Sequence, residues 1–243
     1  MRDAFASSAY FGAVLSVAAY SFGMWLKKKT GLAVCNPLLV AAVIIVPVLL
    51  VSGITYDEYM LGAENISYLL TPATVCLAIP LYKQLRLLKE NKAAVFCSIA
   101  AGVVANALTI FVLCLLFKME HVHYVTLLPK SITTAIGMGV SEEAGGIVTL
   151  TVVSIIITGV SGVIMSEALF KLFKLEEPIA RGLALGNGAH AIGTAKALEL
   201  GEVEGAMSSL AVVAAGIITV AGSGFRGTDT MKIESEGKTY AGI

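Results

Sequence analysis

The sequence has few charged residues, and this scarcity excludes an ordinary soluble domain. Charged residues make up 14% of the 243 residues and hydrophobic residues 57%, whereas soluble domains average about 25% and roughly 45–50%. A soluble fold of this length cannot bury so much apolar surface, but a bilayer solvates it directly. The formal net charge is zero, so the composition gives no sign of a nucleic-acid partner. The sequence therefore predicts an integral membrane protein whose surroundings are the lipid bilayer.

The sequence also lacks the motifs of common catalytic and metal sites. It contains no Gly-x-Ser-x-Gly, no His-Glu-x-x-His and no Walker loop. Its four cysteines all lie in apolar stretches without the spacing of metal ligands. We therefore expect neither an enzyme nor a cofactor or metal site.

Charge-free stretches divide the chain into about seven or eight hydrophobic segments. A helix needs about 20 apolar residues to cross the hydrocarbon, and five segments qualify: Ala4–Leu26, Gly31–Tyr56, Ala93–Phe117, Ala144–Ser166 and Gly205–Phe225. Two more are interrupted: Asp57–Glu90 by Thr71-Pro72-Ala73-Thr74, and Glu176–Leu200 by Gly186-Asn187-Gly188-Ala189-His190. The predicted fold class is an all-α polytopic membrane protein, with one transmembrane domain over 1–226 and a polar tail over 227–243.

An eighth segment, Leu127–Glu143, is short and polar for a membrane span. It either crosses inside the bundle or enters the membrane and returns. The positive-inside rule places Lys27–Lys29, Lys83–Lys92 and Lys171–Lys174 in the cytoplasm. A re-entrant segment also brings the end of the last helix, at Arg226, to that side. The rule favours the re-entrant alternative, with the N-terminus outside and the C-terminus cytoplasmic.

A shift of 113 residues, from Gly31 to Ala144, reveals a possible internal repeat. It aligns Thr71–Thr74 with Ala184–Asn187 and gives identical pairs such as Ile79 and Ile192. Each repeat, about 31–117 and about 144–225, is then a helix, a broken helix and a helix. Three crossings make the two repeats run in opposite directions, which is typical of secondary transporters. The alternative is two ordinary kinked helices, but two matching breaks favour a substrate site.

The breaks carry uncharged polar groups that suit a small organic anion. A broken helix turns N–H groups and the positive end of its dipole toward the gap. The predicted substrate-binding residues at the breaks are Thr71, Pro72, Thr74, Asn187, Gly188, His190, Gly193 and Thr194. His190 either carries a coupling proton, since imidazole titrates near neutrality, or is a neutral histidine bonded to a carbonyl that the break frees.

A second polar cluster lies in the eighth segment. Lys130, Ser131 and Thr134 complete the predicted binding set, with Lys130 attracting the anion. Ser141 is expected to cap a helix that begins near Gly145, with Glu142 and Glu143 stabilised by its dipole. The functional alternative makes either glutamate a proton carrier. Asn106, a polar residue in an apolar run, is expected to bond to a broken helix.

Four ordered stretches resemble the LrgB/CidB family: Thr71–Tyr82, Leu128–Thr134, Val140–Gly146 and Arg181–Ala195. The chain departs from that family in having Ala189-His190-Ala191 where Ser-His-Gly is usual, and Ala135-Ile136-Gly137-Met138 where Pro-Ile-Ala-Met is usual. Its final helix is also shorter than usual. These differences bear on substrate or coupling and leave the expected fold unchanged.

The resemblance implies two functions. One is holin- or antiholin-like control of murein hydrolase activity and lysis, with a small LrgA/CidA-like membrane partner. The other is carriage of small monocarboxylates, as in the plastid glycolate/glycerate translocator and bacterial relatives linked to pyruvate uptake. Paired broken helices favour a secondary transporter, with His190, Glu142 and Glu143 as the candidates for coupling it to protons. We expect a homo-oligomer in the bacterial cytoplasmic (inner) membrane; an inert scaffold for a partner is a third alternative.

Overall fold

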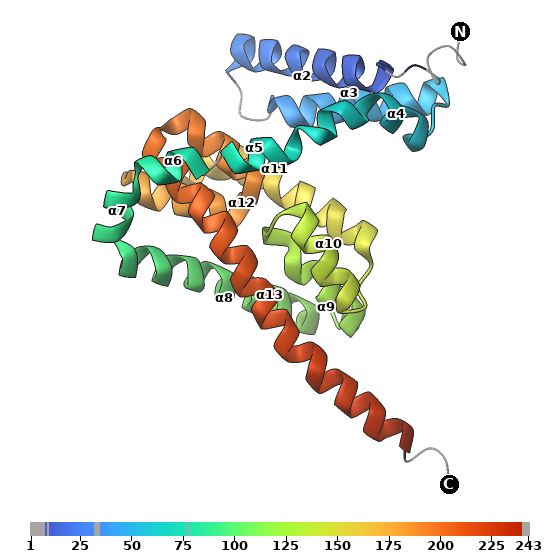
Figure 1. Ribbon diagram of the computed structural model, residues 1–243, viewed down its shortest axis with the longest axis vertical. Coiled ribbons are helices and arrows are strands. Elements are labelled where there is room, and N and C mark those ends of the chain that lie inside the picture. Colours follow the sequence, from blue (N-terminus) through green and yellow to red (C-terminus); the bar gives the residue numbers. More distant parts are fainter. Residues whose placement is uncertain (1–7, 9, 32–34, 77, 240–243) are drawn as a thin grey trace. The chain divides into compact units, whose positions relative to one another are not determined.

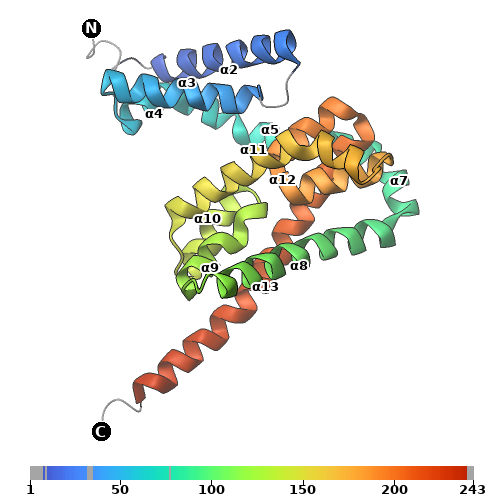
Figure 2. The same cartoon turned by 180° about the vertical axis from the view of Figure 1, so that it is seen from behind.

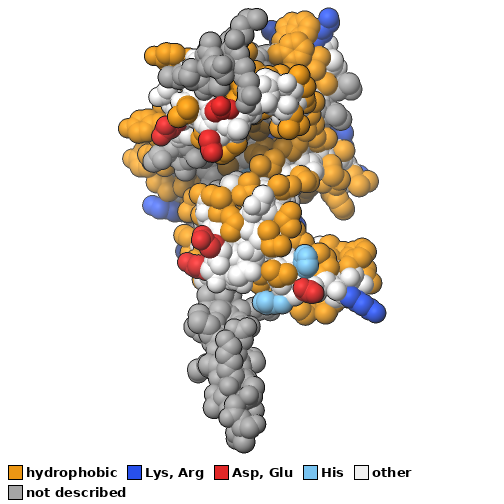
Figure 3. Space-filling model, turned by 90° about the vertical axis from the view of Figure 1, so that its right-hand side faces the viewer, with side chains coloured by type: hydrophobic (Ala, Val, Ile, Leu, Met, Phe, Trp, Pro, Cys, Tyr) orange, Lys and Arg blue, Asp and Glu red, His pale blue; other side chains and the backbone are white. Residues whose placement is uncertain are grey.

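In the computed structural model, every secondary-structure element of the described residues is a helix (Figure 1). The structure describes residues 8, 10–31, 35–76 and 78–239. Three of the described helices are long and apolar enough to cross a membrane: Lys92–Leu116, Val148–Leu172 and the part Glu202–Gly222 of the last helix. Figure 3 shows hydrophobic side chains over much of the visible surface, with charged ones in small groups. The predicted α-helical membrane protein is confirmed.

The chain forms two compact units, Met1–Ala78 and Ile79–Ile243. The first contains α2 (Phe11–Thr30), α3 (Pro37–Ser52), α4 (Tyr56–Tyr68) and α5 (Leu70–Cys76). Helix α3 is apolar but has only 16 residues, because Asn36 and Pro37 begin it and left-handed Gly53 ends it. Gly12 of α2 lies against Tyr59 and Ala63 of α4, where no larger residue fits. The two predicted spans in this unit are therefore packed helices, shorter or less apolar than the three of the second unit.

The predicted break at Thr71–Thr74 is wrong in position. These residues lie inside α5, because Pro72 is in its first turn, where its missing N–H costs no hydrogen bond. Helix α5 ends at Cys76 and α6 begins at Ala78. Position 77 lies outside the described residues, as do the side chains of Thr71 and Thr74.

The second unit is built on the three long helices α8 (Lys92–Leu116), α11 (Val148–Leu172) and α13 (Glu202–Thr239). Before them come α6 (Ala78–Lys83) and α7 (Leu85–Glu90), and between them α9 (His121–Leu127), the 3-10 helix η1 (Leu128–Ser131), α10 (Thr134–Glu143) and α12 (Pro178–Leu200). Val95 and Ile99 of α8 pack on Leu183 of α12 and Met207 of α13 in the main core. Most of the predicted polar tail continues α13 as helix, to Thr239.

The segment His121–Glu143 folds back on itself and is called the first hairpin. Its α9 runs antiparallel to α8, since Tyr124 packs near Cys114 while Asn106 bonds to Ser131 further along. Its α10 then returns. Thr151 Oγ1 lies 2.8 Å from the Thr126 carbonyl oxygen and 2.7 Å from Ser141 Oγ, so both arms lie side by side at the base. This geometry favours the re-entrant alternative for Leu127–Glu143.

Helix α12 also folds back, and it is called the second hairpin. At His190 the backbone has φ 42° and ψ −133°, which ends one helix and starts another. Leu185 and Ala197 belong to one cluster with Phe170, although a straight helix would hold them about 18 Å apart. Gly193 lies against the Leu185 carbonyl, so the turn is tight. Figure 2 shows α12 beside α11 and α13.

The second hairpin corrects the predicted topology. Because both its ends lie near the end of α11, with Arg181 and Leu200 around one pocket, Glu176–Leu200 is not a crossing. Helix α13 starts near the end of α11, because Leu200, two residues before it, lines one pocket with Lys171 and Lys174. Its start also lies near the start of α8, since Lys83 is 3.6 Å from Glu202, and α13 packs along both α8 and α12. The end of α11 near Lys174 and the end of α13 near residue 226 therefore lie at opposite ends of the unit. Where α11 and α13 cross the membrane, these two ends lie on opposite sides of it, whereas the prediction places both in the cytoplasm.

Candidate functional site

The two hairpins enter the second unit from opposite ends and their tips meet beside the middle of α11. The first hairpin is fixed at the start of α11, where Ile147 N donates to Thr126 Oγ1 over 2.8 Å. The second lies at its other end, where the Arg181 guanidinium is over the Phe170 ring. Both tips reach Ile155: Gly137 of α10 lies against its side chain, and His190 lies 3.0 Å from its carbonyl oxygen. Residues of η1 and α12 come within 8 Å of each other between Cα atoms.

Helix α8 contacts both tips with residues one turn apart. Gly102 lies against the side chain of Asn187 from the second hairpin, whose Nδ2 donates to the Ser98 carbonyl over 3.4 Å. Asn106 accepts a 3.0 Å hydrogen bond from Ser131 Oγ of the first hairpin and donates to the Leu128 carbonyl. Four residues of helix rise by about 6 Å, so the two tips are close neighbours along α8.

His190 is the residue at which α12 turns. Its positive φ is a conformation that a residue with a side chain rarely adopts. The imidazole is buried, and it fits because Gly159 of α11 has no side chain there. Since a carbonyl oxygen can only accept, Nε2 carries the hydrogen in the bond to Ile155. The carbonyl that it binds belongs to α11 and is not one freed by the break.

Buried hydroxyl groups hold the second arm of α12 in place. Thr194 Oγ1 donates to the His190 carbonyl over 3.1 Å and lies 2.9 Å from Ser208 Oγ of α13. Gly193 is also buried, while Gly188 is exposed. Asn187 Oδ1 is buried and has no hydrogen-bond partner among the described residues. Among the described side chains of the second tip, this acceptor is the one buried polar atom without a hydrogen-bond partner.

The first tip carries the predicted Lys130, Ser131 and Thr134. Lys130 is half-buried and its Nζ donates to Ser131 Oγ over 3.2 Å; Ser131 is buried and in turn bonds to Asn106. Thr134 is half-buried at the start of α10. The three residues therefore do lie together, and Asn106 bonds to this tip rather than to a broken helix of the repeats.

Two helix N-termini face the meeting point of the tips. Helix α10 begins at Thr134, and Thr133 gives it no side-chain cap; the second arm of α12 begins after His190. The first N–H groups of a helix have no partner within it, and its dipole adds partial positive charge. With Lys130 beside them, these ends form a positive surrounding for a small anion. The sequence predicted facing N-termini, but between the wrong pair of segments.

The remaining predicted residues lie elsewhere. Glu142 and Glu143 are exposed in the last turn of α10, at the base of the first hairpin, about 13 Å of helix from Thr134. Ser141 lies inside α10 and caps nothing, because α11 begins only at Val148, after left-handed Gly145. Pro72 is exposed in the first unit. The expected N-terminal placement of the two glutamates is therefore wrong.

Each tip borders a separate pocket. One of about 240 Å³ lies between α8 and α13, beside Asn106 and Leu128. Another of about 220 Å³ is apolar and reaches Gly188 and Ala189 from the side of α11. Neither of these two pockets is lined by both tips.

A family model described as the LrgB-like family matches residues 16–225. The chain belongs to this family. Over 206 residues, 85% of this chain and 90% of the relative, it is 41% identical to the holin-like protein CidB of Staphylococcus aureus (strain Mu50 / ATCC 700699). Over 214 residues, 88% and 93%, it is 40% identical to the antiholin-like protein LrgB of Bacillus subtilis (strain 168). No solved structure matches the chain.

Sequence reasoning missed the residues of α8, α11 and α13 that contact the second hairpin of this site. Gly102, Gly159 and Ser208 contact the second hairpin, yet each stands in an apolar stretch where small residues are common. The available signal was their type: glycine and serine in membrane helices mark places of close approach. The Ile155 carbonyl has no sequence signal, because any residue offers one.

Proposed function

We propose that this LrgB-like protein is a secondary transporter of small organic monocarboxylates, of the glycolate, glycerate or pyruvate type, and not an enzyme. The observation that carries the proposal is the convergence of two helix N-termini, at Thr134 and after His190, beside the middle of α11. Helix N-termini bind carboxylates, and transporters form their sites from such interrupted helices at mid-membrane depth.

In this proposal the carboxylate binds between the tips. Lys130 attracts it, Ser131 and Thr134 offer hydroxyls, and the free acceptor Asn187 Oδ1 takes a hydrogen bond from a substrate hydroxyl. Neither of the two pockets beside the tips touches both of them, so in this proposal a hairpin swings out at one end and then at the other during transport. His190, at the turn of the second tip, is the candidate proton carrier, because imidazole takes up and releases a proton near neutrality.

A second function is favoured by the names of the relatives. Those names are holin-like and antiholin-like, and they support a holin- or antiholin-like function more directly than transport. In this alternative the protein controls lysis as a homo-oligomer in the bacterial inner membrane, with a small LrgA/CidA-like partner. The geometry supports transport, since a lesion-forming protein does not need two hairpins with facing tips. Lysis control then follows from metabolite flux, or is exerted without a specific substrate.

Uptake by purified protein in liposomes separates the alternatives. Transport predicts saturable uptake of labelled glycolate or pyruvate that His190→Ala abolishes, and Asn187→Ala should raise the KM for glycolate about tenfold. Thr109→Ala, on the exposed face of α8, is the matched control and should transport normally. Unsaturable leakage of unrelated solutes indicates a pore, and no flux without a partner indicates a scaffold; either result contradicts the proposal.

A further inference from the structure

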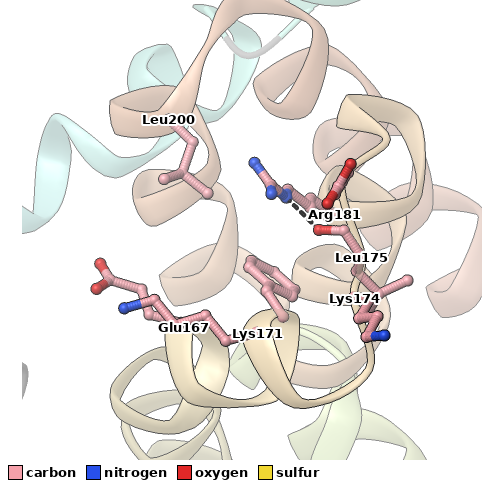
Figure 4. A pocket seen from close by; sticks show the side chains of 8 residues that line it. Glu167, Lys171, Lys174, Leu175, Arg181 and Leu200 are labelled. Atoms are coloured by element: carbon pink, nitrogen blue, oxygen red, sulfur yellow. Dashed lines mark hydrogen bonds between the residues drawn. The ribbon is translucent and has the colours of Figure 1, made fainter.

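A charged pocket of about 430 Å³ lies at the end of α11, between that helix and both ends of α12. Figure 4 shows Arg181 and Leu200, from the two ends of α12, on opposite sides of it, with Glu167 and Lys171 on the α11 side. Lys174 and Glu176 also line it. None of these residues belongs to the hairpin tips.

The charges of this pocket favour an anion. Three cations line it against two carboxylates, and Glu167 is already ion-paired with Lys196, 2.7 Å away, outside the lining. Arg181 is held in position, since its Nε donates to the Leu175 carbonyl over 2.7 Å and its guanidinium carbon lies 5.7 Å from the centre of the Phe170 ring. Among the described residues, the terminal Nη groups of Arg181 make no hydrogen bond. A guanidinium fixed in this way binds phosphate through two parallel N–H groups.

An apolar groove continues from the charged pocket. It has a volume of about 220 Å³ and shares Phe170 and Leu175 with the charged pocket. Its other lining residues are almost all apolar. They run back along α11 from Phe173 to Gly162, a helix length of about 16 Å, and along the first arm of α12 from Ala184 to Ala189 at the second tip. Ser166 is the exception, and its hydroxyl bonds to the Val163 carbonyl. The two cavities together have one charged end and one apolar end.

The site lies at the membrane boundary. Helix α11 is one of the three candidate spans, and its charged end begins at Lys171. A phospholipid presents its phosphate at that depth and its acyl chains toward the bilayer centre. We propose that the charged pocket and the groove bind one anionic phospholipid, with its phosphate at Arg181 and Lys171 and an acyl chain along Phe173–Gly162. The excess of cations selects it over zwitterionic lipids.

Lipid binding to the full-length protein in detergent, measured by native mass spectrometry, tests this. The probes are dioleoyl phosphatidylglycerol, dioleoyl phosphatidylcholine and free glycerol 3-phosphate. We expect phosphatidylglycerol to bind at least tenfold more tightly than the other two. Arg181→Gln should weaken it roughly tenfold, the loss of a charge-assisted pair. Arg86→Gln is the matched control, since Arg86 is exposed and its ion-pair partner among the described residues is Glu90, one turn away.

A second variant tests the groove without touching the charges. Ala184 lines the groove and is exposed, so Ala184→Phe should fill the groove and leave the fold intact. We expect it to weaken phosphatidylglycerol roughly tenfold and to leave glycerol 3-phosphate unchanged. Equal binding of the two lipids, or equal effects of Arg181→Gln and Arg86→Gln, would overturn the proposal. Tight binding of glycerol 3-phosphate that Ala184→Phe does not alter would assign the pocket to a soluble anion and also overturn it.

Discussion

His190 Nε2 lies 3.0 Å from the carbonyl oxygen of Ile155, and this contact fixes the tip of one hairpin to the middle of α11. The same residue of α11 receives the other hairpin, through Gly137 and the Ile155 side chain. Two segments that start at opposite ends of the unit thus meet at one residue. The account of the site depends on this contact.

Close packing at Gly159 should be essential to the second hairpin. An alanine methyl there would lie 2.7 Å from His190 Nε2 and 2.8 Å from Ile192 Cδ1. Gly159→Ala should therefore lower the free energy of unfolding by about 1–3 kcal/mol, measured by chemical denaturation in detergent with circular dichroism. Gly139→Ala is the matched control. A methyl on Gly139 meets nothing within 4 Å, so this change should be neutral or stabilise α10 by up to about 1 kcal/mol. Equal effects of the two changes would contradict the close packing.

The hydroxyl pair of Thr194 and Ser208 should respond unequally to substitution. Thr194 donates to the His190 carbonyl and lies within hydrogen-bond distance of Ser208. Thr194→Val keeps the shape but leaves both partners unpaired in the core, which should cost about 1–3 kcal/mol of unfolding free energy. Ser208→Ala leaves the bond to His190 and should cost less than half as much. Thr109→Val, at an exposed position, should change stability by less than about 0.5 kcal/mol. A larger loss for Ser208→Ala than for Thr194→Val would show that the bonding is different.

Asn187 should matter more for transport than for stability. Its Oδ1 is buried without a partner and its Nδ2 makes one long bond, to Ser98. Asn187→Ala removes an unpaired acceptor, so we expect a loss of less than about 1 kcal/mol in unfolding free energy. If the group binds substrate, the KM for uptake in liposomes should rise about tenfold, which corresponds to about 1.4 kcal/mol. Asn91→Ala, which removes a comparable amide at the start of α8, should leave KM unchanged. A destabilised variant with normal KM would give Asn187 a purely structural role.

The sequence predicted the long helices well and the hairpins poorly, for a physical reason. Apolar length predicted Ala93–Phe117 and Ala144–Ser166, and the structure has helices Lys92–Leu116 and Val148–Leu172. Apolar length cannot tell a helix of 23 residues that crosses from one that turns back at its middle, such as α12. The glycines around His190 showed that the helix breaks, but not in which direction the chain leaves the break.

The treatment of α12 as a crossing also affected two further predictions, the orientation and the partner of the second break. Counting α12 as a crossing placed residue 226 on the side of Lys171, and the repeat placed Thr71–Thr74 opposite His190. Tertiary contacts give the second tip a different neighbour, the first hairpin with Ser131 and Thr134. Lys130, Ser131 and Thr134 had been predicted from their residue types, and they do lie at a tip.

Sidedness of labelling tests the central claim most directly. In a variant whose four cysteines are replaced by alanine, single cysteines are placed at Glu120, Glu143, Glu176 and Glu202, all exposed near hairpin bases. A membrane-impermeant maleimide is then applied to either face of oriented vesicles. Two re-entrant hairpins predict that the cysteines of Glu176→Cys and Glu202→Cys react from one face. Those of Glu120→Cys and Glu143→Cys should react from the other. If the cysteines of Glu176→Cys and Glu202→Cys react from opposite faces, α12 crosses the membrane. That result would contradict the meeting of two tips beside Ile155.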